Sequence, residues 1–225
     1  MHPIEKLQKR ITACTVCARL REHCLGVAET KRRAYRDWTY WGKPVPSFGD
    51  PEARLLIVGL APGAHGANRT GRMFTGDSSG DFLYKVLHST GFANQPHSVS
   101  ATDGLTLLDA YITASCRCAP PDNKPSREEL SNCRPFLVEE LKLLRQVRVV
   151  VVLGRIAFQT YCSVRNLRGL DFGHAREHRP SGGPVLLCSY HPSQQNTSTG
   201  RLTEPMLRAV FVRAKNLIED PSAPS

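Results

Sequence analysis

Four short apolar runs in the chain have the length and composition of buried strands. They lie at 55–60, 111–115, 147–153 and 185–189. A polar loop and then a stretch with apolar positions at helical spacing follow each run. Strands that alternate with helices predict a mostly parallel sheet with helices on both faces. We therefore expect an α/β protein of three layers, α/β/α, with a mostly parallel, four-stranded central sheet.

Capping signals mark where several of these helices begin. Ser78 or Ser79 is expected to cap the helix that follows the first run, and Thr203 the last helix of the chain. Ser126 and Glu129 have the spacing of a capping box, which predicts a helix start at that point.

The first fifty residues have a different pattern. Ile4, Leu7 and Ile11 share one face of a short predicted helix, and a basic, aromatic stretch then runs to the Pro44 and Pro46 region. These residues hold too few apolar positions for a core of their own. We expect one domain, 1–225, in which residues 1–50 form an amino-terminal arm and residues 221–225 are frayed.

Composition and charge narrow the class of protein. At 225 residues and 40% hydrophobic composition the chain can bury a full core. No apolar run approaches the roughly 20 residues of a membrane-spanning helix, and the amino terminus lacks a signal-peptide core. We expect a cytoplasmic protein that does not bind membranes.

The net charge of +10 favours a polyanionic partner, although plain solubility would also explain it. Basic residues crowd two stretches, 31–36 and 165–179, and the first is interleaved with Tyr35, Trp38 and Tyr40. Basic and aromatic side chains together suit the phosphates and bases of a nucleic acid.

Three polar loops follow predicted strands, at 59–80, 117–125 and 190–201. In a parallel sheet such loops meet at one edge, where ligands bind. The first loop is rich in glycines, which allow tight turns and close approach of a ligand. We expect its polar side chains to supply the chemistry of a site; they are Asn68, Arg69, Arg72 and Asp77.

Common nucleotide-binding motifs do not account for this loop. Gly66 and Gly71 have the spacing of a Walker loop, but Arg72 and Met73 stand in place of the lysine and the hydroxyl residue. The chain also lacks the Gly-x-Gly-x-x-Gly of dinucleotide-binding proteins.

Eight cysteines in a protein expected inside the cell indicate metal or redox chemistry rather than disulfides. Cys14 and Cys17 form a closely spaced pair, and Cys118 and Cys133 a wider one. An iron-sulfur cluster, a zinc ion and unligated thiols all fit this spacing. Cys24 and Cys116 leave the number of ligands open. Cys162 and Cys188 have apolar neighbours, which is typical of core residues.

Three sequence blocks carry a family resemblance. They are GLAPGAHGANRTGRMFTGD at 59–77, CAPPDNKP at 118–125 and SYHPSQQNT at 189–197. Together they resemble the signature blocks of uracil-DNA glycosylases, closest to family five, the type-b enzymes. The resemblance covers nearly the whole chain. It implies an α/β domain with a [4Fe-4S] cluster that flips uracil, and other deaminated bases such as hypoxanthine, out of DNA.

Such an enzyme hydrolyses the N-glycosidic bond and leaves an abasic site, which starts base excision repair. The resemblance implies a monofunctional glycosylase, since no lysine is placed as a Schiff-base nucleophile. The expected partner is double-stranded and also single-stranded DNA, and the expected state is a monomer associated with the nucleoid. The alternative is a non-catalytic iron-sulfur protein that binds DNA and senses damage or redox state.

The resemblance also assigns the cluster ligands. The family's third ligand directly precedes an Ala-Pro-Pro turn, which matches Cys118 rather than Cys116. With Cys14, Cys17 and Cys133 this gives four thiolates, which would tie the amino-terminal arm to the sheet. The cluster is expected to be structural, because hydrolysis needs no electrons.

Two residues are expected to be catalytic. Asp77 would position water or stabilise the positively charged sugar, and His191 would donate a hydrogen bond to the uracil O2 as negative charge collects there. Each also has a plain structural explanation: Asp77 as a helix cap or turn carboxylate, and His191 as a residue that only ends a strand.

The remaining candidates would line the base pocket. Phe74 can stack on the flipped base, Asn123 can pair with the uracil edge, and the small Ala114 leaves room for larger bases. The full set of substrate-binding candidates is Gly59, Leu60, Ala61, Gly63, Phe74, Ala114, Asn123 and Asn196.

Overall fold

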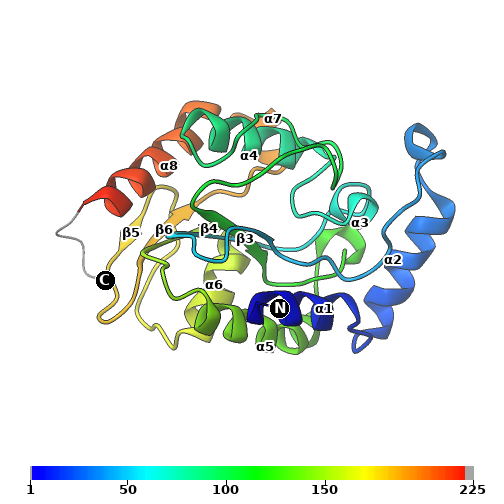
Figure 1. The fold of residues 1–225 in the computed structure, drawn as a ribbon, viewed down its shortest axis with the longest axis horizontal. Coiled ribbons are helices and arrows are strands. Elements are labelled where there is room, and N and C mark those ends of the chain that lie inside the picture. Colours follow the sequence, from blue (N-terminus) through cyan, green and yellow to red (C-terminus); the bar gives the residue numbers. More distant parts are fainter. Residues whose placement is uncertain (1, 221–225) are drawn as a thin grey trace.

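A computed structural model describes residues 2–220 and contains a six-stranded sheet in the order β1-β3-β2-β4-β6-β5 (Figure 1). The four central strands are mutually parallel, and β1 and β5 pair antiparallel at the two edges. The strands are β1 Phe48–Gly49, β2 Leu55–Gly59, β3 Ala110–Ala114, β4 Val149–Leu153, β5 Glu177–His178 and β6 Val185–Ser189. The four predicted strands are confirmed. The two edge strands were missed because two residues cannot show a periodic pattern.

Helices cover both faces of the sheet, as predicted. In Figure 1, α1, α5 and α6 lie below the strands, α4 and α8 lie above them, and α2 and α3 stand at one side. The α-helices are α1 Pro3–Thr12, α2 Ala18–Thr30, α3 Ala67–Thr70, α4 Ser78–Ser89, α5 Arg127–Leu143, α6 Arg155–Val164, α7 Gln194–Ser198 and α8 Glu204–Glu219, with 3₁₀ turns η1 Arg33–Tyr35 and η2 Pro121–Asn123. None of these helices is long and apolar enough to cross a membrane.

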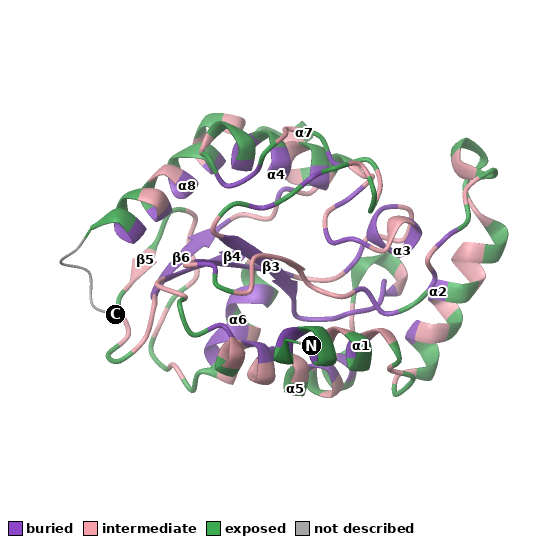
Figure 2. Ribbon diagram, viewed as in Figure 1, coloured by how far each residue is buried: buried purple, intermediate pink, exposed green. Residues whose placement is uncertain are grey.

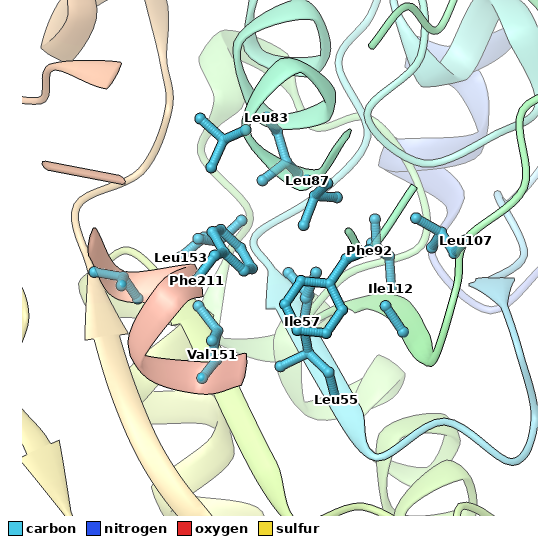
Figure 3. Packing of buried hydrophobic residues seen from close by; sticks show 14 of the residues in the cluster. Leu55, Ile57, Leu83, Leu87, Phe92, Leu107, Ile112, Val151, Leu153 and Phe211 are labelled. Atoms are coloured by element: carbon cyan, nitrogen blue, oxygen red, sulfur yellow. The ribbon is translucent and has the colours of Figure 1, made fainter. Parts of the chain in front are cut away.

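The central strands are buried along their whole length (Figure 2). Side chains that alternate along each strand enter two different cores, one on each face of the sheet. Ile57 and Val151 pack with Leu83 of α4 and Phe211 of α8 (Figure 3). On the opposite face, the neighbouring Leu56, Val58 and Val150 pack with Phe158 of α6. Burial on both faces explains why the strands read as continuous apolar runs.

The predicted caps have mixed outcomes. Ser126 and Glu129 form the expected capping box at the start of α5. The cap of α4 is Asp77, not Ser78 or Ser79, because the Asp77 carboxylate accepts the Gly80 amide at 3.0 Å. Thr203 occupies the cap position of α8, but its side chain makes no capping hydrogen bond. The stretch 221–225, expected to be frayed, lies outside the described residues.

The amino-terminal arm contains more helix than predicted. Helix α1 buries Ile4, Leu7 and Ile11 as expected. Helix α2 was not predicted, because it buries only Leu20 and Cys24 and therefore shows little periodicity.

A buried ion pair joins this arm to the sheet. Arg117 pairs with Glu140 of α5, and both side chains are almost completely enclosed. Thr113 of β3 and Ser47 of the arm donate hydrogen bonds to the same carboxylate. A buried charge is stable only with such partners. This network therefore fixes the arm, β3 and α5 relative to one another.

Replacing Glu140 with Ala should destabilise the protein by about 3–5 kcal/mol, because it leaves the Arg117 guanidinium buried without its carboxylate. The matched control is Glu139→Ala, also in α5, which removes an exposed pair with Arg10 of α1 and should cost below about 1 kcal/mol. Urea unfolding of the two variants measures both values. Equal losses would contradict this role of the buried pair.

Candidate active site

The carboxyl ends of the parallel strands form one edge, and the loops after β2 and β6 meet there. Phe74 lies in the loop after β2 and His191 directly follows β6. Their ring centroids are 6.0 Å apart. The third polar loop predicted to converge also reaches this edge, because Ala61 and Ala64 of the loop after β2 pack against a cluster that includes Cys118 and Ala119 of the loop after β3.

Asp77 lies in a space that glycines leave open. A Cβ atom at Gly63 would come within 2.7 Å of the Asp77 Oδ2 atom, and one at Gly66 within 1.9 Å. No side chain other than hydrogen fits at Gly66 while Asp77 keeps its position. The carboxylate is thus held against the backbone of its own loop and remains partly open to solvent.

The surroundings of Asp77 favour its protonated form. Burial raises the pKa of the Asp77 carboxyl, and the negative charge of Asp81 adds to this effect. The backbone amides of Gly80 and Ser79, and the charge of Arg69, act in the opposite direction. A carboxylate with raised pKa that is still reachable from solvent is typical of a functional site.

Phe74 has a strained backbone and a close contact with β2. Its φ of 51° is unusual for a residue with a bulky side chain. Its ring covers Gly59, where a Cβ atom would come within 2.9 Å of the ring. A Cβ atom at Gly80 would strike the Phe74 carbonyl oxygen at 1.8 Å. The glycines on both sides therefore determine where this ring lies, and strain of this kind gathers at functional sites.

His191 is held as a neutral imidazole. Burial lowers its pKa to about 4, so the ring is uncharged at neutral pH. Its backbone carbonyl accepts a hydrogen bond from the Asn196 amide at 2.9 Å, and Ser193 caps the short helix α7 that carries Asn196. Asn196 thus supports the position of His191 by contact with its backbone.

The other predicted pocket residues differ in where they lie relative to Phe74 and His191. Gly59 pairs with Ala114 across the ends of β2 and β3, and Leu60 and Ala61 follow β2 as half-buried residues. Asn123 is exposed in η2, and its side chain makes no hydrogen bond among the described residues. No contact in this part of the chain brings Asn123 against Phe74 or His191.

Three polar residues of the glycine-rich loop serve the fold instead of facing a ligand, contrary to expectation. Arg72 pairs with Asp103 at 2.8 Å. The Asn68 amide donates to the Cys24 carbonyl at 3.2 Å, and the Arg69 guanidinium donates to backbone carbonyls within the loop. The sequence could not separate these from Asp77, because burial of a polar side chain depends on the segments that cover it.

Most of the cysteines gather at the junction of the arm and the sheet. Cys24, Cys116, Cys118 and Cys133 form one buried cluster, and Cys17 packs against it. The Sγ atoms of Cys116 and Cys133 are 4.0 Å apart. Among residues 2–220 no three Cys, His, Asp or Glu side chains surround one point as a single bound metal ion requires.

The two cysteines predicted to be core residues are confirmed as such. Cys162 of α6 and Cys188 of β6 lie in the apolar core between that helix and the sheet, outside the cluster of the other buried thiols.

Known proteins with similar sequences define the class. Residues 46–215 match the uracil DNA glycosylase superfamily, so the chain belongs to that superfamily. Within it the chain is 50% identical to the type-5 uracil-DNA glycosylase of Thermus thermophilus, over 95% of this chain and 97% of the relative. It is 49% identical to the Mycobacterium leprae type-5 enzyme over 95% of both chains, and 45% identical to that of Pyrobaculum aerophilum over 91% of this chain and 89% of the relative. These matches confirm the resemblance inferred from the three sequence blocks.

Replacing Gly66 with Ala should expel the Asp77 carboxylate from its pocket, since the new methyl group would occupy the same space. We expect a loss of about 1–3 kcal/mol in folding free energy from overpacking. The pKa of Asp77 should fall toward its ordinary value as the carboxyl gains solvent. Carboxyl-carbon NMR titration and urea unfolding measure the two effects.

Gly26→Ala is the control for this variant, because a Cβ atom there meets nothing within 4 Å. In the middle of α2 it should stabilise the protein by about 0.5–1 kcal/mol. An unchanged Asp77 titration in Gly66→Ala would show that the glycine does not shape this pocket.

Proposed function

We propose that this protein removes uracil from DNA by hydrolysing the N-glycosidic bond, with Asp77 and His191 as its catalytic residues. One observation carries the proposal. In a chain of the uracil-DNA glycosylase superfamily, the half-buried Asp77 lies in the same glycine-rich loop as Phe74, whose ring centroid is 6.0 Å from that of a neutral His191. The product is free uracil and an abasic site, from which base excision repair proceeds.

The charges that develop in this reaction suit the two residues. As the bond breaks, the sugar becomes positive and the departing base negative. The Asp77 carboxylate can stabilise the sugar or orient the attacking water. A neutral imidazole is a hydrogen-bond donor that does not have to be charged first, and His191 can donate to the uracil O2. Phe74 can stack on the flipped base.

The same pocket supports the finer parts of the proposal. Gly59 and the buried Ala114 place little bulk at the ends of β2 and β3, which agrees with acceptance of hypoxanthine as well as uracil. Leu60, Ala61 and Gly63 complete this wall, and Asn123 is proposed to meet the base edge when DNA is bound. We propose that the protein acts as a monomer on double-stranded and single-stranded DNA.

A [4Fe-4S] cluster is proposed to be held by Cys14, Cys17, Cys118 and Cys133. The donor types fit, because thiolates are the ligands of such clusters. Cys17, Cys118 and Cys133 lie together where the arm meets the sheet, and Cys14 precedes Cys17 by three residues. When bound, the cluster would supply a covalent link between the arm and the sheet.

Replacing Asp77 with Asn tests the catalytic assignment against the structural one. Asn caps a helix about as well as Asp, so a residue that only caps α4 would tolerate the change. We expect release of uracil from a uracil-containing duplex to fall at least about 100-fold. Asp81→Asn, in the first turn of α4, should keep its activity. Full activity in both Asp77→Asn and His191→Ala would refute the assignment.

The same variant should be more stable than the wild type at neutral pH. Because the folded protein raises the pKa of Asp77, the wild type loses stability as pH rises from the ordinary aspartate range through the raised value. Asn carries no such cost. Thermal unfolding should therefore show a higher midpoint for Asp77→Asn at pH near 7, and the difference should shrink on acidification.

Single Cys→Ala variants test the cluster ligands. Replacement of Cys14, Cys17, Cys118 or Cys133 should lower the bound iron and sulfide of the purified protein. Cys24→Ala and Cys116→Ala are matched controls, since both thiols lie in the same cysteine cluster but are not proposed ligands. Iron retained in the first group and lost in the controls would reassign the ligands.

A further inference from the structure

Arg69 differs from the other arginines buried in the described part of the chain. Its side chain is only 3% exposed, and Arg72 and Arg117 are buried to a similar degree. Arg72 pairs with Asp103 and Arg117 with Glu140, whereas Arg69 forms no ion pair among residues 2–220. A guanidinium keeps its charge at every physiological pH, and burying that charge without a carboxylate is costly. A buried charge without a carboxylate partner therefore indicates a specific role for Arg69.

The hydrogen bonds of Arg69 join the two ends of the glycine-rich loop. Its Nε atom donates to the His65 carbonyl at 2.8 Å, and its Nη2 atom donates to the Gly76 carbonyl at 2.8 Å. Gly76 directly precedes Asp77. A Cβ atom at Gly76 would come within 2.3 Å of the Arg69 Nη2 atom, so a glycine is needed there for this approach. The third nitrogen, Nη1, is buried without a partner.

Two aromatic rings of the amino-terminal arm enclose the guanidinium. Its central carbon lies 3.9 Å from the Tyr35 ring centroid and 4.1 Å from that of Trp38. The Trp41 amide donates to the Arg69 carbonyl at 2.9 Å and fixes the arm beside the loop. Cation–π contacts stabilise the charge and keep water from it. These arm aromatics, which the sequence suggested for nucleic-acid contact, are engaged within the protein.

We propose that Arg69 is a positioning residue, which holds the Asp77 end of the loop in place and directs its uncompensated positive charge at the Asp77 carboxylate. The inference rests on the proposed catalytic role of Asp77. The arm then serves the site as well as the fold, because Tyr35 and Trp38 keep the field of this charge unscreened by water.

The electrostatics agree with this geometry. Among the described residues, the charged side chains that act on Asp77 are Asp81 of α4, which raises the pKa of its carboxyl, and Arg69 of α3, which lowers it. His65 also faces Arg69 and is biased toward its neutral form, since burial, Arg32 and Arg69 lower its pKa. Arg69 is therefore the side-chain charge that opposes the cost of desolvating Asp77.

The test compares Arg69→Gln, Arg69→Lys and the wild type. Kinetics of uracil release are measured across pH, and Asp77 is titrated directly by carboxyl-carbon NMR. In Arg69→Gln, kcat should fall roughly 10- to 100-fold with KM for DNA unchanged, because a misplaced group slows chemistry without weakening binding. The pKa of Asp77 and the acid limb of the pH profile should move to higher pH, since the favourable charge is gone. Arg69→Lys keeps the charge but not the paired hydrogen bonds, so kcat should fall with the acid limb unmoved.

Arg72→Gln is the matched control, because Arg72 is buried in the same loop but pairs with Asp103. It should lower stability without moving the Asp77 titration. If Arg69→Gln does not fold, Trp38→Leu should produce a smaller upward shift by admitting water to the guanidinium.

Two results would overturn the inference. One is an unchanged pKa of Asp77 in Arg69→Gln relative to the wild type. If Arg69→Gln does not fold, an unchanged pKa of Asp77 in Trp38→Leu counts in its place. The other is a loss confined to KM, which would make Arg69 a DNA contact. Failure of the proposed function is recognised separately, as full activity in both Asp77→Asn and His191→Ala.

Discussion

The close approach of the Asp77 carboxylate to the backbone at Gly63 and Gly66 is the constraint on which the site depends. It fixes the course of the loop after β2, because a side chain at Gly66 would force the carboxylate out. It also fixes the start of α4, since Asp77 caps that helix. The same contact removes water from the carboxyl and raises its pKa. One steric requirement thus joins backbone conformation, helix position and charge.

Buried polar contacts hold this loop in place, whereas helices and strands are held mainly by apolar packing. Arg69 and Arg72 cross-link the loop from within, and Arg117 joins the arm to β3 and α5. Such contacts are directional, and a buried group that loses its partner is strongly destabilising. They therefore specify one loop geometry, as the proposed base and water site requires. The apolar cores on the two faces supply most of the stability and leave the sheet edge free for function.

The amino-terminal arm is integral to the protein despite its weak sequence pattern. It buries Ile4 in the core beside α6, supplies Ser47 to the Arg117–Glu140 pair and covers Arg69 with two rings. Three of the four cysteines proposed to hold the cluster, Cys17, Cys118 and Cys133, lie at its junction with the sheet. In a member of the uracil-DNA glycosylase superfamily, the arm links this junction to the loop that carries Asp77.

The sequence by itself determined the four central strands, the capping box at Ser126, the sheet edge where the polar loops meet and the family, because these depend on local periodicity and on residue order. It did not reveal α2, the edge strands, the Asp77 cap or the burial of Asn68, Arg69 and Arg72. Only the tertiary structure decided which polar residues of the loop face solvent and which are enclosed. Burial and charge pairing arise between segments far apart in the chain, as between Tyr35 and Arg69 or Ser47 and Glu140, and no local pattern records them.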